Sequence, residues 1–503
     1  MKTKFKSLVM ASLLGVVTMT TNAQNNCEPN WLSTKGNKLV DINDNEVILA
    51  GVNWFGFETE KFFPHGIWSR DHKSVLKQIK DLGFNCIRVP WHNGMLKESV
   101  TIEVPSYGSD PYTGVSPMNK IEATFTKPIQ LLDEMVKWCQ ENDIKVILDC
   151  HSRNNDAYLT EKLWFVDQED TLGGTLEVFT EQQWIDDWVF MAERYKNYSA
   201  VIGMDINNEP NGKIDNPRGA RWGTGDKFDW RLASERCGNA ILKANPNVLI
   251  LVEGIEAYTK LNGENTSYWW GGNLQGAKDY PVRLSNPNKL MYSPHEYGPT
   301  VFDQKWFNVP EFPSNMPGIW ETQFNFLTTN NTSPLLIGEL GIKGQGGKDE
   351  IWFQEFINFI KENKLHYTFW ALNPNSGDTG GILANDWTSV VQWKMDYLKP
   401  ILHDRIPNCV VKKGGTLSNE DFIKNETVLV KILPNPTTDK VSITSDYKIK
   451  SVTIYNLSGK IVLENNVPET DDTEFSLANF SNGMYIVKTE TENSVYTTKI
   501  IKE

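Results

Sequence analysis

The chain has 503 residues, of which 40% are hydrophobic and 22% are charged, an ordinary composition for a soluble protein. This length exceeds that of one usual domain and favours two modules. The net charge of −13 disfavours a nucleic-acid partner, because phosphate binding needs a basic face and the sequence shows none. We expect a monomer.

The first residues have the pattern of a secretory signal. Lys2, Lys4 and Lys6 precede the apolar run from Leu8 to Val17, and Thr21-Asn22-Ala23 follows before Gln24. This order predicts a signal peptide over residues 1–23 that is cut near Ala23. The apolar run is too short to span a bilayer, so we expect the mature protein to be secreted or held at the cell surface.

The six cysteines fall into two groups. Cys27 and Cys409 flank the larger module and could staple its ends, and the sequence leaves open whether they bond. The other four lie in apolar patterns and are expected to be buried free thiols: Cys86, Cys139, Cys150 and Cys237. Because the chain has no CxxC motif and its seven histidines show no paired spacing, we expect no metal and no cofactor.

Apolar runs that end in polar or aromatic residues recur along residues 27–408 and predict eight strands. They are Val47–Trp54, Asn85–Trp91, Lys145–His151, Val201–Glu209, Val248–Glu253, Leu290–Tyr297, Leu335–Glu339 and Tyr367–Trp370. Helix-period stretches lie between most of them, for example Val75, Ile79 and Leu82. The alternation predicts an α/β fold, a (β/α)₈ TIM barrel. The fifth helix is the weakest unit, since Tyr258–Lys289 has the composition of a long loop.

Residues 409–427 are polar and contain Gly414-Gly415, which predicts a linker. Residues 428–503 then show seven short alternating strands and predict a small all-β sandwich. These strands are Val428–Leu433, Val441–Thr444, Ser451–Tyr455, Lys460–Glu464, Thr473–Leu477, Gly483–Thr489 and Val495–Ile501. This module has no tryptophan, which disfavours a role as a cellulose-binding module.

Three motifs in this tail occur in a specific order: Leu433-Pro-Asn-Pro436, Ile454-Tyr-Asn-Leu-Ser-Gly-Lys460 and Asn482-Gly-Met-Tyr-Ile-Val487. A basic strand, Lys499–Lys502, closes the chain. In these features the tail resembles the C-terminal sorting domains of type IX secretion substrates. The resemblance implies export across an outer membrane, the secretion machinery as a partner, and removal of the tail.

The stretch Val201–Pro210 brings an amide and a carboxyl to the end of a strand. Its first half is apolar, as a strand buried on both faces requires, and Pro210 ends the strand because it cannot donate to a sheet ladder. Asn208 and Glu209 are therefore expected at the rim. The alternative is an ordinary strand followed by a turn.

In a parallel barrel all strands open on the same face, so the strand ends can be considered together. They bring together Trp54, Arg88, His151, Asn208, Glu209, Glu253, His295, Tyr297, Glu339 and Trp370. Glu209 and Glu339 follow strands that lie across the mouth from each other, and paired carboxylates facing one pocket are what glycoside hydrolysis requires. Glu253 is expected to be a hydrogen-bonding group of the rim.

The neighbours of the two glutamates predict different roles for them. Arg88 and the Tyr297 hydroxyl would keep Glu339 ionised, as a nucleophile. Glu209, beside a neutral amide and near a carboxylate, should have a raised pKa and donate a proton to the leaving oxygen. Asn208 could bind a ring hydroxyl, and His151 and His295 would orient the sugar or the acid. The alternative for Arg88 and its polar neighbours is a structural network.

Aromatic side chains are the predicted sugar platforms. Trp370 is expected to stack under the ring being cleaved, and Trp54, Trp269 and Trp270 are expected to bind glucose units, with a core role as the alternative.

The same residues lie in motifs that run in order along about 380 residues. The motifs are Gly51–Thr59, Ile87-Arg-Val-Pro90, Asp149-Cys-His151, Asn207-Asn-Glu-Pro210, His295-Glu-Tyr297, Ile337-Gly-Glu-Leu-Gly341, Trp370 and Gly377–Ile382. In them the larger module resembles glycoside hydrolase family 5, the cellulase family. Ser267–Gly276 and Met316–Trp320 make it most similar to the bacterial endo-1,4-β-glucanases. Cys150 departs from many relatives and puts local substrate contacts in doubt.

The resemblance implies a retaining double displacement on a β-glucan, with Glu209 as acid/base and Glu339 as nucleophile. We expect their carboxyl groups to lie roughly 5 to 5.5 Å apart. Fold and carboxylates do not determine the sugar, so mannan, lichenan and xyloglucan remain alternative substrates. An alternative of another class is a non-catalytic surface glycan-binding protein.

Overall fold

The computed structural model describes residues 27–102, 126–155, 163–170, 177–411, 430–457, 459–492 and 495–503. The chain divides into two compact units, Met1–Lys412 and Lys413–Glu503. The predicted signal peptide and nearly all of the predicted linker lie outside the described residues. Within the described part, no helix is both long and apolar enough to cross a membrane.

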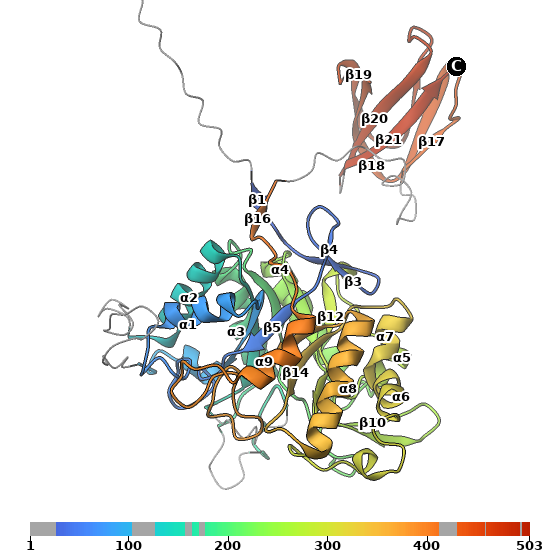
Figure 1. The fold of residues 1–503 in the computed structure, drawn as a ribbon. Coiled ribbons are helices and arrows are strands. Elements are labelled where there is room, and N and C mark those ends of the chain that lie inside the picture. The colour runs from blue at the N-terminus through green and yellow to red at the C-terminus, as the bar shows by residue number, and fades with distance from the viewer. Residues whose placement is uncertain are drawn as a thin grey trace, which may run out of the picture. The chain divides into compact units, whose positions relative to one another are not determined.

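The first unit is built on one sheet of parallel strands (Figure 1). In chain order the strands are β5 (Ala50–Asn53), β6 (Cys86–His92), β7 (Lys145–Ser152), β8 (Val201–Asp205), β9 (Leu249–Val252), β12 (Leu290–Tyr292), β13 (His295–Tyr297), β14 (Leu336–Gly341) and β15 (His366–Phe369). Their order across the sheet is β12-β9-β8-β7-β6-β5-β15-β14-β13. Each of the eight predicted strands is present, and the sheet curls as a (β/α)₈ barrel requires.

The predicted strand Leu290–Tyr297 is divided into β12 and β13. Pro294 has no backbone N–H and cannot continue a ladder, so the strand breaks there. The two halves pair with different neighbours: β12 pairs with β9, and β13 pairs with β14. An isolated bridge between Tyr292 and Leu335 joins the two ends of the sheet. The divided strand therefore closes the barrel and carries His295 and Tyr297 at its far end.

Helices lie outside the barrel (Figure 1). The longer ones are α1 (His72–Asp81), α2 (Pro128–Asn142), α3 (Glu181–Arg194), α4 (Trp230–Ala244), α8 (Gly347–Asn363) and α9 (Gln392–Leu398). The helical period expected around Val75 is confirmed, and Val75, Leu131 and Trp352 are buried in α1, α2 and α8. Helix α3 begins with a capping box between Thr180 and Gln183, which satisfies two backbone donors of its first turn.

Shorter segments complete the first unit. They are α5 (Gly276–Asp279), α6 (Met316–Trp320), α7 (Phe326–Thr329), the 3₁₀ helices η1 (Asn93–Leu96), η3 (Pro287–Lys289), η4 (Lys305–Asn308) and η6 (Lys399–Ile401), the π-helical segment η5 (Glu321–Asn325), and the hairpin β10 (Ala257–Thr259) and β11 (Asn265–Ser267). This hairpin and α5 occupy the expected long loop after the fifth strand. The prediction that no full-length helix fills this segment is confirmed.

The amino-terminal end of the barrel is closed by an apolar plug. A small antiparallel sheet of β2 (Ser33–Lys35), β3 (Lys38–Val40) and β4 (Glu46–Val47) covers it. Leu32, Leu39 and Leu49 pack there against Ile147 and Leu249 from the barrel strands. Burial of these side chains excludes water from that end, so the polar chemistry of the barrel is concentrated at the opposite end.

The ends of this unit are tied together. Strand β1 (Glu28–Pro29) pairs with β16 (Cys409–Val410), and a disulfide joins Cys27 to Cys409 with a Cα–Cα distance of 5.4 Å. The sequence left this pairing open. The other four cysteines are buried free thiols, as predicted.

The second unit is an all-β domain with one antiparallel network. It contains β17 (Val430–Leu433), β18 (Lys440–Asn456), β19 (Ile461–Ser476), β20 (Gly483–Thr491) and β21 (Val495–Lys502). The predicted strands Val441–Thr444 and Ser451–Tyr455 form the single strand β18, and Lys460–Glu464 and Thr473–Leu477 lie together in β19. Register shifts in both strands let the chain bend where we expected a turn. The first part of β18 pairs with β17 and the second with β20, around a core that includes Ile443, Val452 and Val487.

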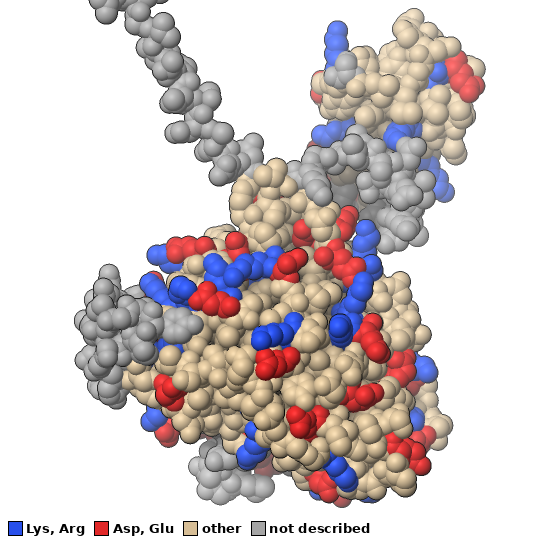
Figure 2. Space-filling model, in the orientation of Figure 1, with Lys and Arg blue, Asp and Glu red and all other residues tan. Residues whose placement is uncertain are grey.

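Surface charge is mixed on the face of the first unit shown in Figure 2. Acidic and basic side chains alternate over this face, and neither sign forms a continuous patch on it.

Candidate active site

The carboxyl ends of the barrel strands surround Arg88, which β6 places in the interior with no exposed surface. Its Nε donates a hydrogen bond to Asp205 Oδ2 at 3.0 Å. Its Nη1 donates to Glu339 Oε1 at 2.8 Å and to Asn53 Oδ1 at 3.1 Å. Its Nη2 donates to Asn208 Oδ1 at 3.0 Å and to Glu253 Oε1 at 3.2 Å. Asp149 Oδ1 lies 3.1 Å from Nη2. A buried cation is stable only when it is paired in this way, so Arg88 holds four carboxyl groups at fixed positions.

Glu339 lies in β14 and is held by two strong donors. Besides Arg88, the Tyr297 hydroxyl donates to its Oε2 at 2.6 Å. Burial would raise the pKa of Glu339, but the neighbouring His295, the charges of Arg88 and His151 and the Tyr297 hydrogen bond lower it below the ordinary value. Glu339 is therefore ionised, in the state that a nucleophile needs.

Glu209 follows β8 in the opposite environment. Burial raises its pKa to about 7, and the nearby carboxylate of Glu339 acts in the same direction, against the hydrogen bond from His295. Its backbone lies in the left-handed region, with φ 44°, so the chain turns sharply where the strand ends. Glu209 is therefore able to hold a proton near neutral pH.

His295 lies between the two glutamates. Its Nδ1 is 2.9 Å from Glu209 Oε1 and 3.7 Å from Glu339 Oε2. One carboxylate oxygen of each glutamate and one ring nitrogen of His295 all lie within 4.8 Å of one another. The structure thus brings together two carboxyls with opposite proton affinities, which the sequence predicted to face each other.

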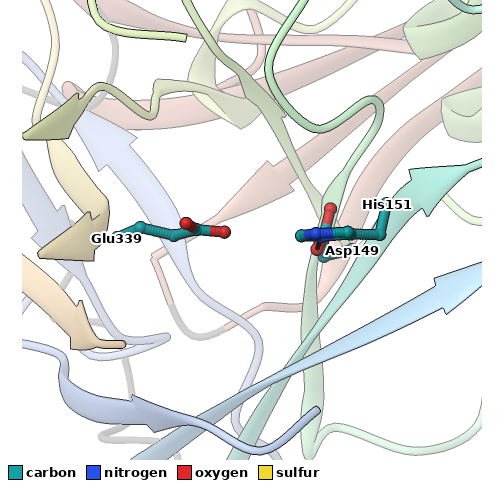
Figure 3. Close-up of side chains that lie close together, drawn as sticks. All are labelled: Asp149, His151 and Glu339. Atoms are coloured by element: carbon teal, nitrogen blue, oxygen red, sulfur yellow. Dashed lines mark hydrogen bonds and ion pairs between the residues drawn. The ribbon is translucent and has the colours of Figure 1, made fainter. Parts of the chain in front are cut away.

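His151 faces Glu339 from the other side of the barrel mouth (Figure 3). Its Nδ1 lies 2.7 Å from Asp149 Oδ2. Burial would lower the pKa of His151, but the carboxyls of Asp149, Glu339 and Glu58 raise it to about 9. His151 is therefore a cation at neutral pH and adds to the positive charge that stabilises ionised Glu339.

Trp370 and Asn208 present groups that a sugar could bind. The Trp370 ring is partly buried and stacks against His151, with centroids 5.6 Å apart and an interplanar angle of 9°. Asn208 Nδ2 is buried and makes no hydrogen bond within the described residues, so a donor remains available beside Glu209.

The three tryptophans predicted as sugar platforms differ in how exposed their side chains are. Trp54 is wrong as a sugar platform, because its side chain is 0% exposed and its Nε1 donates to the His65 carbonyl at 2.9 Å. Trp269 is 7% exposed and packs edge-on against Tyr297, so the core alternative holds for it. Trp270 is 40% exposed. It alone of the three offers a ring to solvent.

Three members of the Arg88 network were not predicted as site residues: Asn53, Asp149 and Asp205. The signal for Asp205 is a charge inside the apolar run Val201–Ile206, because a carboxyl in a fully buried strand must have a partner. Asp149 lies two residues before His151, so both point to the same face of β7. Glu253 is a hydrogen-bonding group, as expected.

Three sets of side chains have ligand atoms close enough to hold a metal ion: Asp149, His151 and Glu339; Asp205, Glu253 and His295; and Glu209, His295 and Glu339. Each set includes a carboxylate that Arg88 already binds. The guanidinium supplies the positive charge that a metal would bring, and we assign no metal ligand here.

Comparison with known proteins identifies the family. The profile described as "Cellulase (glycosyl hydrolase family 5)" matches residues 40–376. The chain belongs to glycosyl hydrolase family 5. It is therefore a glycoside hydrolase, as the paired carboxylates predicted. A second profile, "Secretion system C-terminal sorting domain", matches residues 431–503, so the second unit is a type IX sorting domain and the protein is exported.

Relatives in this family are similar over most of the first unit. An endoglucanase of Paenibacillus polymyxa is 41% identical over 378 residues, which cover 74% of this chain and 87% of that protein. The major extracellular endoglucanase of Xanthomonas campestris pv. campestris is 37% identical over 368 residues, covering 72% of this chain and 69% of its own. The solved catalytic domain of the major endoglucanase from that organism is 36% identical, with a TM-score of 0.64, and covers 74% of this chain and 99% of its own.

An endocellulase of Pyrococcus horikoshii solved in complex with cellotetraose is also similar. It is 36% identical with a TM-score of 0.65, and the match covers 75% of this chain and 99% of that one. These family 5 structures match the (β/α)₈ unit, which confirms the predicted fold class.

Proposed function

We propose that this protein is a retaining endo-1,4-β-glucanase that is secreted and hydrolyses internal bonds of cellulose and related β-glucans. Its relatives at 37–41% identity are named endoglucanases, and a similar solved structure holds cellotetraose. The proposal also includes a signal peptide cut near Ala23 and a monomeric enzyme.

The two carboxyl groups divide the reaction between them. Ionised Glu339 attacks the anomeric carbon and forms a glycosyl ester, while Glu209 gives its proton to the departing glycosidic oxygen. Glu209 then takes a proton from water as the water attacks the same carbon, and the ester bond to Glu339 breaks. Both glutamates end in their starting states, so the cycle needs no other reactant.

The observation that carries this proposal is the short separation of the carboxylates. A retaining enzyme needs carboxyl groups roughly 5 to 5.5 Å apart, and an inverting enzyme needs roughly 6.5 to 9.5 Å to fit a water. Oxygens of Glu209 and Glu339 within 4.8 Å of each other support the retaining arrangement.

The remaining site residues receive supporting roles. Arg88 and Tyr297 hold Glu339 in line with the anomeric carbon, and Asn208 Nδ2 is available for the ring hydroxyl beside that carbon. Trp370 provides the ring on which the reacting sugar stacks. His151 and His295 orient Glu339 and Glu209, and Trp270 is a platform for a more distant glucose unit.

Two substitutions and one product analysis test the proposal. Glu339→Gln should lower kcat on carboxymethylcellulose by at least about 10⁴-fold, since the nucleophile is lost. Glu209→Gln should be similarly inactive on the polysaccharide but should form the ester readily from an aryl cellobioside whose leaving group needs no proton. NMR of the first product should show the β-anomer; an initial α-anomer contradicts retention.

Polysaccharide preference needs its own measurement. Initial rates on carboxymethylcellulose, lichenan, mannan and xyloglucan should be highest on the 1,4-linked glucan. A viscosity drop that precedes the release of reducing ends identifies internal cleavage. A higher rate on mannan overturns the substrate and leaves the mechanism in place.

A further inference from the structure

Glu253 contacts three members of the catalytic constellation at once, although it has no role in either chemical step. It follows β9 and has no exposed surface. Its Oε2 accepts the backbone N–H of Glu209 at 2.7 Å, and its Oε1 lies 3.2 Å from both Arg88 Nη2 and His295 Nε2.

The contact with the Glu209 backbone has a structural purpose. Glu209 has a positive φ of 44°, which its Cβ makes unfavourable, and the hydrogen bond to Glu253 holds the residue there. Gly271, with φ 67°, packs directly on this carboxyl, because a Cβ at that position would lie 2.3 Å from Glu253 Oε2. The loop after β9 therefore encloses Glu253 against the Glu209 turn.

The charges around Glu253 favour its neutral form. Burial raises the pKa of Glu253 well above its ordinary value, and Asp205, Asp149 and Glu339 raise it further against the effect of Arg88. The charged and titratable groups that face it come from five barrel strands. They are Arg88 of β6, Asp149 of β7, Asp205 and Glu209 of β8, His295 of β13 and Glu339 of β14.

The hydrogen bonding of the two His295 ring nitrogens indicates a role for a neutral Glu253. The Nδ1 of His295 is paired with Glu209 Oε1, while its buried Nε2 has no hydrogen-bond partner within the described residues, even though Glu253 Oε1 is 3.2 Å away. A neutral imidazole has one N–H and one acceptor nitrogen. An acceptor Nε2 facing a carboxylic acid fits this arrangement.

We propose that Glu253 is a positioning residue for the acid/base glutamate, acting as a carboxylic acid that donates to His295 Nε2 and so fixes the imidazole as an Nδ1–H donor to Glu209. The inference rests on the proposed function, because it assigns Glu209 the acid/base role. Through His295 and the backbone bond, one buried acid determines both the position of Glu209 and its proton affinity.

The amide isostere separates this role from that of a counter-ion for Arg88. In Glu253→Gln the oxygen still accepts the Glu209 N–H and the NH₂ group can still donate to His295 Nε2, but it can no longer accept from Arg88 Nη2, as Oε1 of the acid does. We expect a smaller loss of kcat than in Glu253→Leu and an unchanged pH profile. Glu253→Leu removes both contacts and should lower kcat by about 10²-fold with little change in KM. A pH profile of Glu253→Gln that shifts as far as that of Glu253→Leu would overturn the proposal.

The pH profile provides a readout that lost packing alone would not move. Without the Nδ1–H bond from His295, which lowers the pKa of Glu209, the acid should stay protonated to higher pH. The basic limb of kcat/KM in Glu253→Leu should therefore shift upward by roughly one unit. A lower rate at every pH with an unmoved limb contradicts the proposal.

Glu256 offers a matched control in the same loop. Its Oε2 accepts the backbone N–H of Gly212 at 2.9 Å, just as Glu253 accepts that of Glu209. Glu256→Gln and Glu256→Leu should keep the wild-type pH profile.

A measurement on the wild type does not depend on how the variants fold. ¹⁵N NMR of the imidazoles, with the His295 signal identified by its loss in His295→Asn, should show the Nδ1–H tautomer. An Nε2–H tautomer overturns the inference. A wild-type protein that lacks activity on all the β-glucans would instead overturn the proposed function.

Discussion

Two glutamates of identical chemistry acquire opposite proton affinities from the residues around them. Glu339 meets cationic groups and a hydroxyl donor, and Glu209 is buried beside two other carboxyls. The separation of their pKa values supports the proposed roles of Glu209 as the acid and Glu339 as the nucleophile, because only a pair of unlike states can perform the first step.

This separation predicts the dependence of activity on pH. Glu209 must be protonated to act as the acid, so kcat/KM on polysaccharide should fall as the pH rises through about 7. Glu339 must be ionised, and its lowered pKa places the acidic limb below 4.5. Initial rates between pH 3 and 9 on carboxymethylcellulose test both limbs. On an aryl cellobioside with an activated leaving group, the ester-forming step should lose its basic limb; if it keeps that limb, Glu209 is not the acid.

Glu58 should make stability depend on pH. Burial raises its pKa from 4.5 to about 7, so the unfolded chain ionises first as the pH rises. Stability is therefore full below 4.5 and declines up to about 7, by on the order of 3 kcal/mol from this group.

Glu58→Gln removes the ionisation and should flatten this part of the curve. Urea unfolding at pH 4.5 and pH 8 measures the difference between variant and wild type. Glu264→Gln, at the exposed hairpin between β10 and β11, is the control and should follow the wild-type curve. A Glu58→Gln curve parallel to wild type contradicts the prediction.

The sequence predicted those site residues that are marked by their position at the end of an apolar run. Glu209, Glu339, Arg88, His295 and Tyr297 follow apolar runs, so their place at the strand ends was predictable. Asp149 and Asp205 were missed because their partner, Arg88, lies in another strand, and only the closed barrel brings the charges together. Trp54 was misjudged because burial of a ring cannot be read from its position after a strand.

The loop between β11 and α5 combines exposed and buried aromatic rings. Trp270→Ala should raise KM on polysaccharide by about 3- to 10-fold and leave activity on an aryl cellobioside unchanged, because one stacking contact with a distant sugar is lost. Trp270→Phe should retain part of the affinity. The neighbouring change Trp269→Ala removes a buried ring and should lower the melting temperature instead. An unchanged KM in Trp270→Ala would remove this ring from the substrate path.

The pairing of β1 with β16 should contribute to stability through its disulfide. Cys27–Cys409 closes a loop with a sequence separation of 382 residues, and such a link restricts the unfolded chain. Cys27→Ser with Cys409→Ser should cost about 2–5 kcal/mol of unfolding free energy and leave kcat at 25 °C unchanged. Thermal unfolding with and without reductant measures the effect. The double variant should no longer respond to reductant; if the wild type also fails to respond, the prediction is wrong.

Element boundaries were predictable where one local rule decides them, and not elsewhere. The apolar runs gave each barrel strand, whereas the division at Pro294 depends on β13 finding a second neighbour, β14. In the second unit we expected turns between short strands. Register shifts in β18 allow strand pairing to continue through the positions where we expected turns. Local composition does not reveal such shifts.

At the scale of the whole molecule, two compact units have separate cores and separate assignments. The family 5 match ends at residue 376 and the sorting-domain match begins at residue 431, so catalysis and export belong to different parts of the chain.

Truncation should separate these functions. A chain that ends at Val411 keeps the disulfide and every site residue, and should match the full chain in kcat and melting temperature. In a host with type IX secretion it should accumulate in the periplasm. Cell fractionation and a zymogram locate the activity, and export of the shortened protein would show that the tail is dispensable.

The enclosure of Arg88 among carboxyl groups also determines how the activity of the enzyme depends on salt concentration. Dissolved ions screen charges that water can reach, with a Debye length of about 8 Å at physiological ionic strength, and they weaken exposed pairs such as Lys77 with Asp81 first. The Arg88–Glu339 pair has no contact with the medium beyond a few per cent of the glutamate surface, so its attraction persists in concentrated salt. The rate of hydrolysis of an uncharged glucan should consequently be the same at low and at high salt concentration.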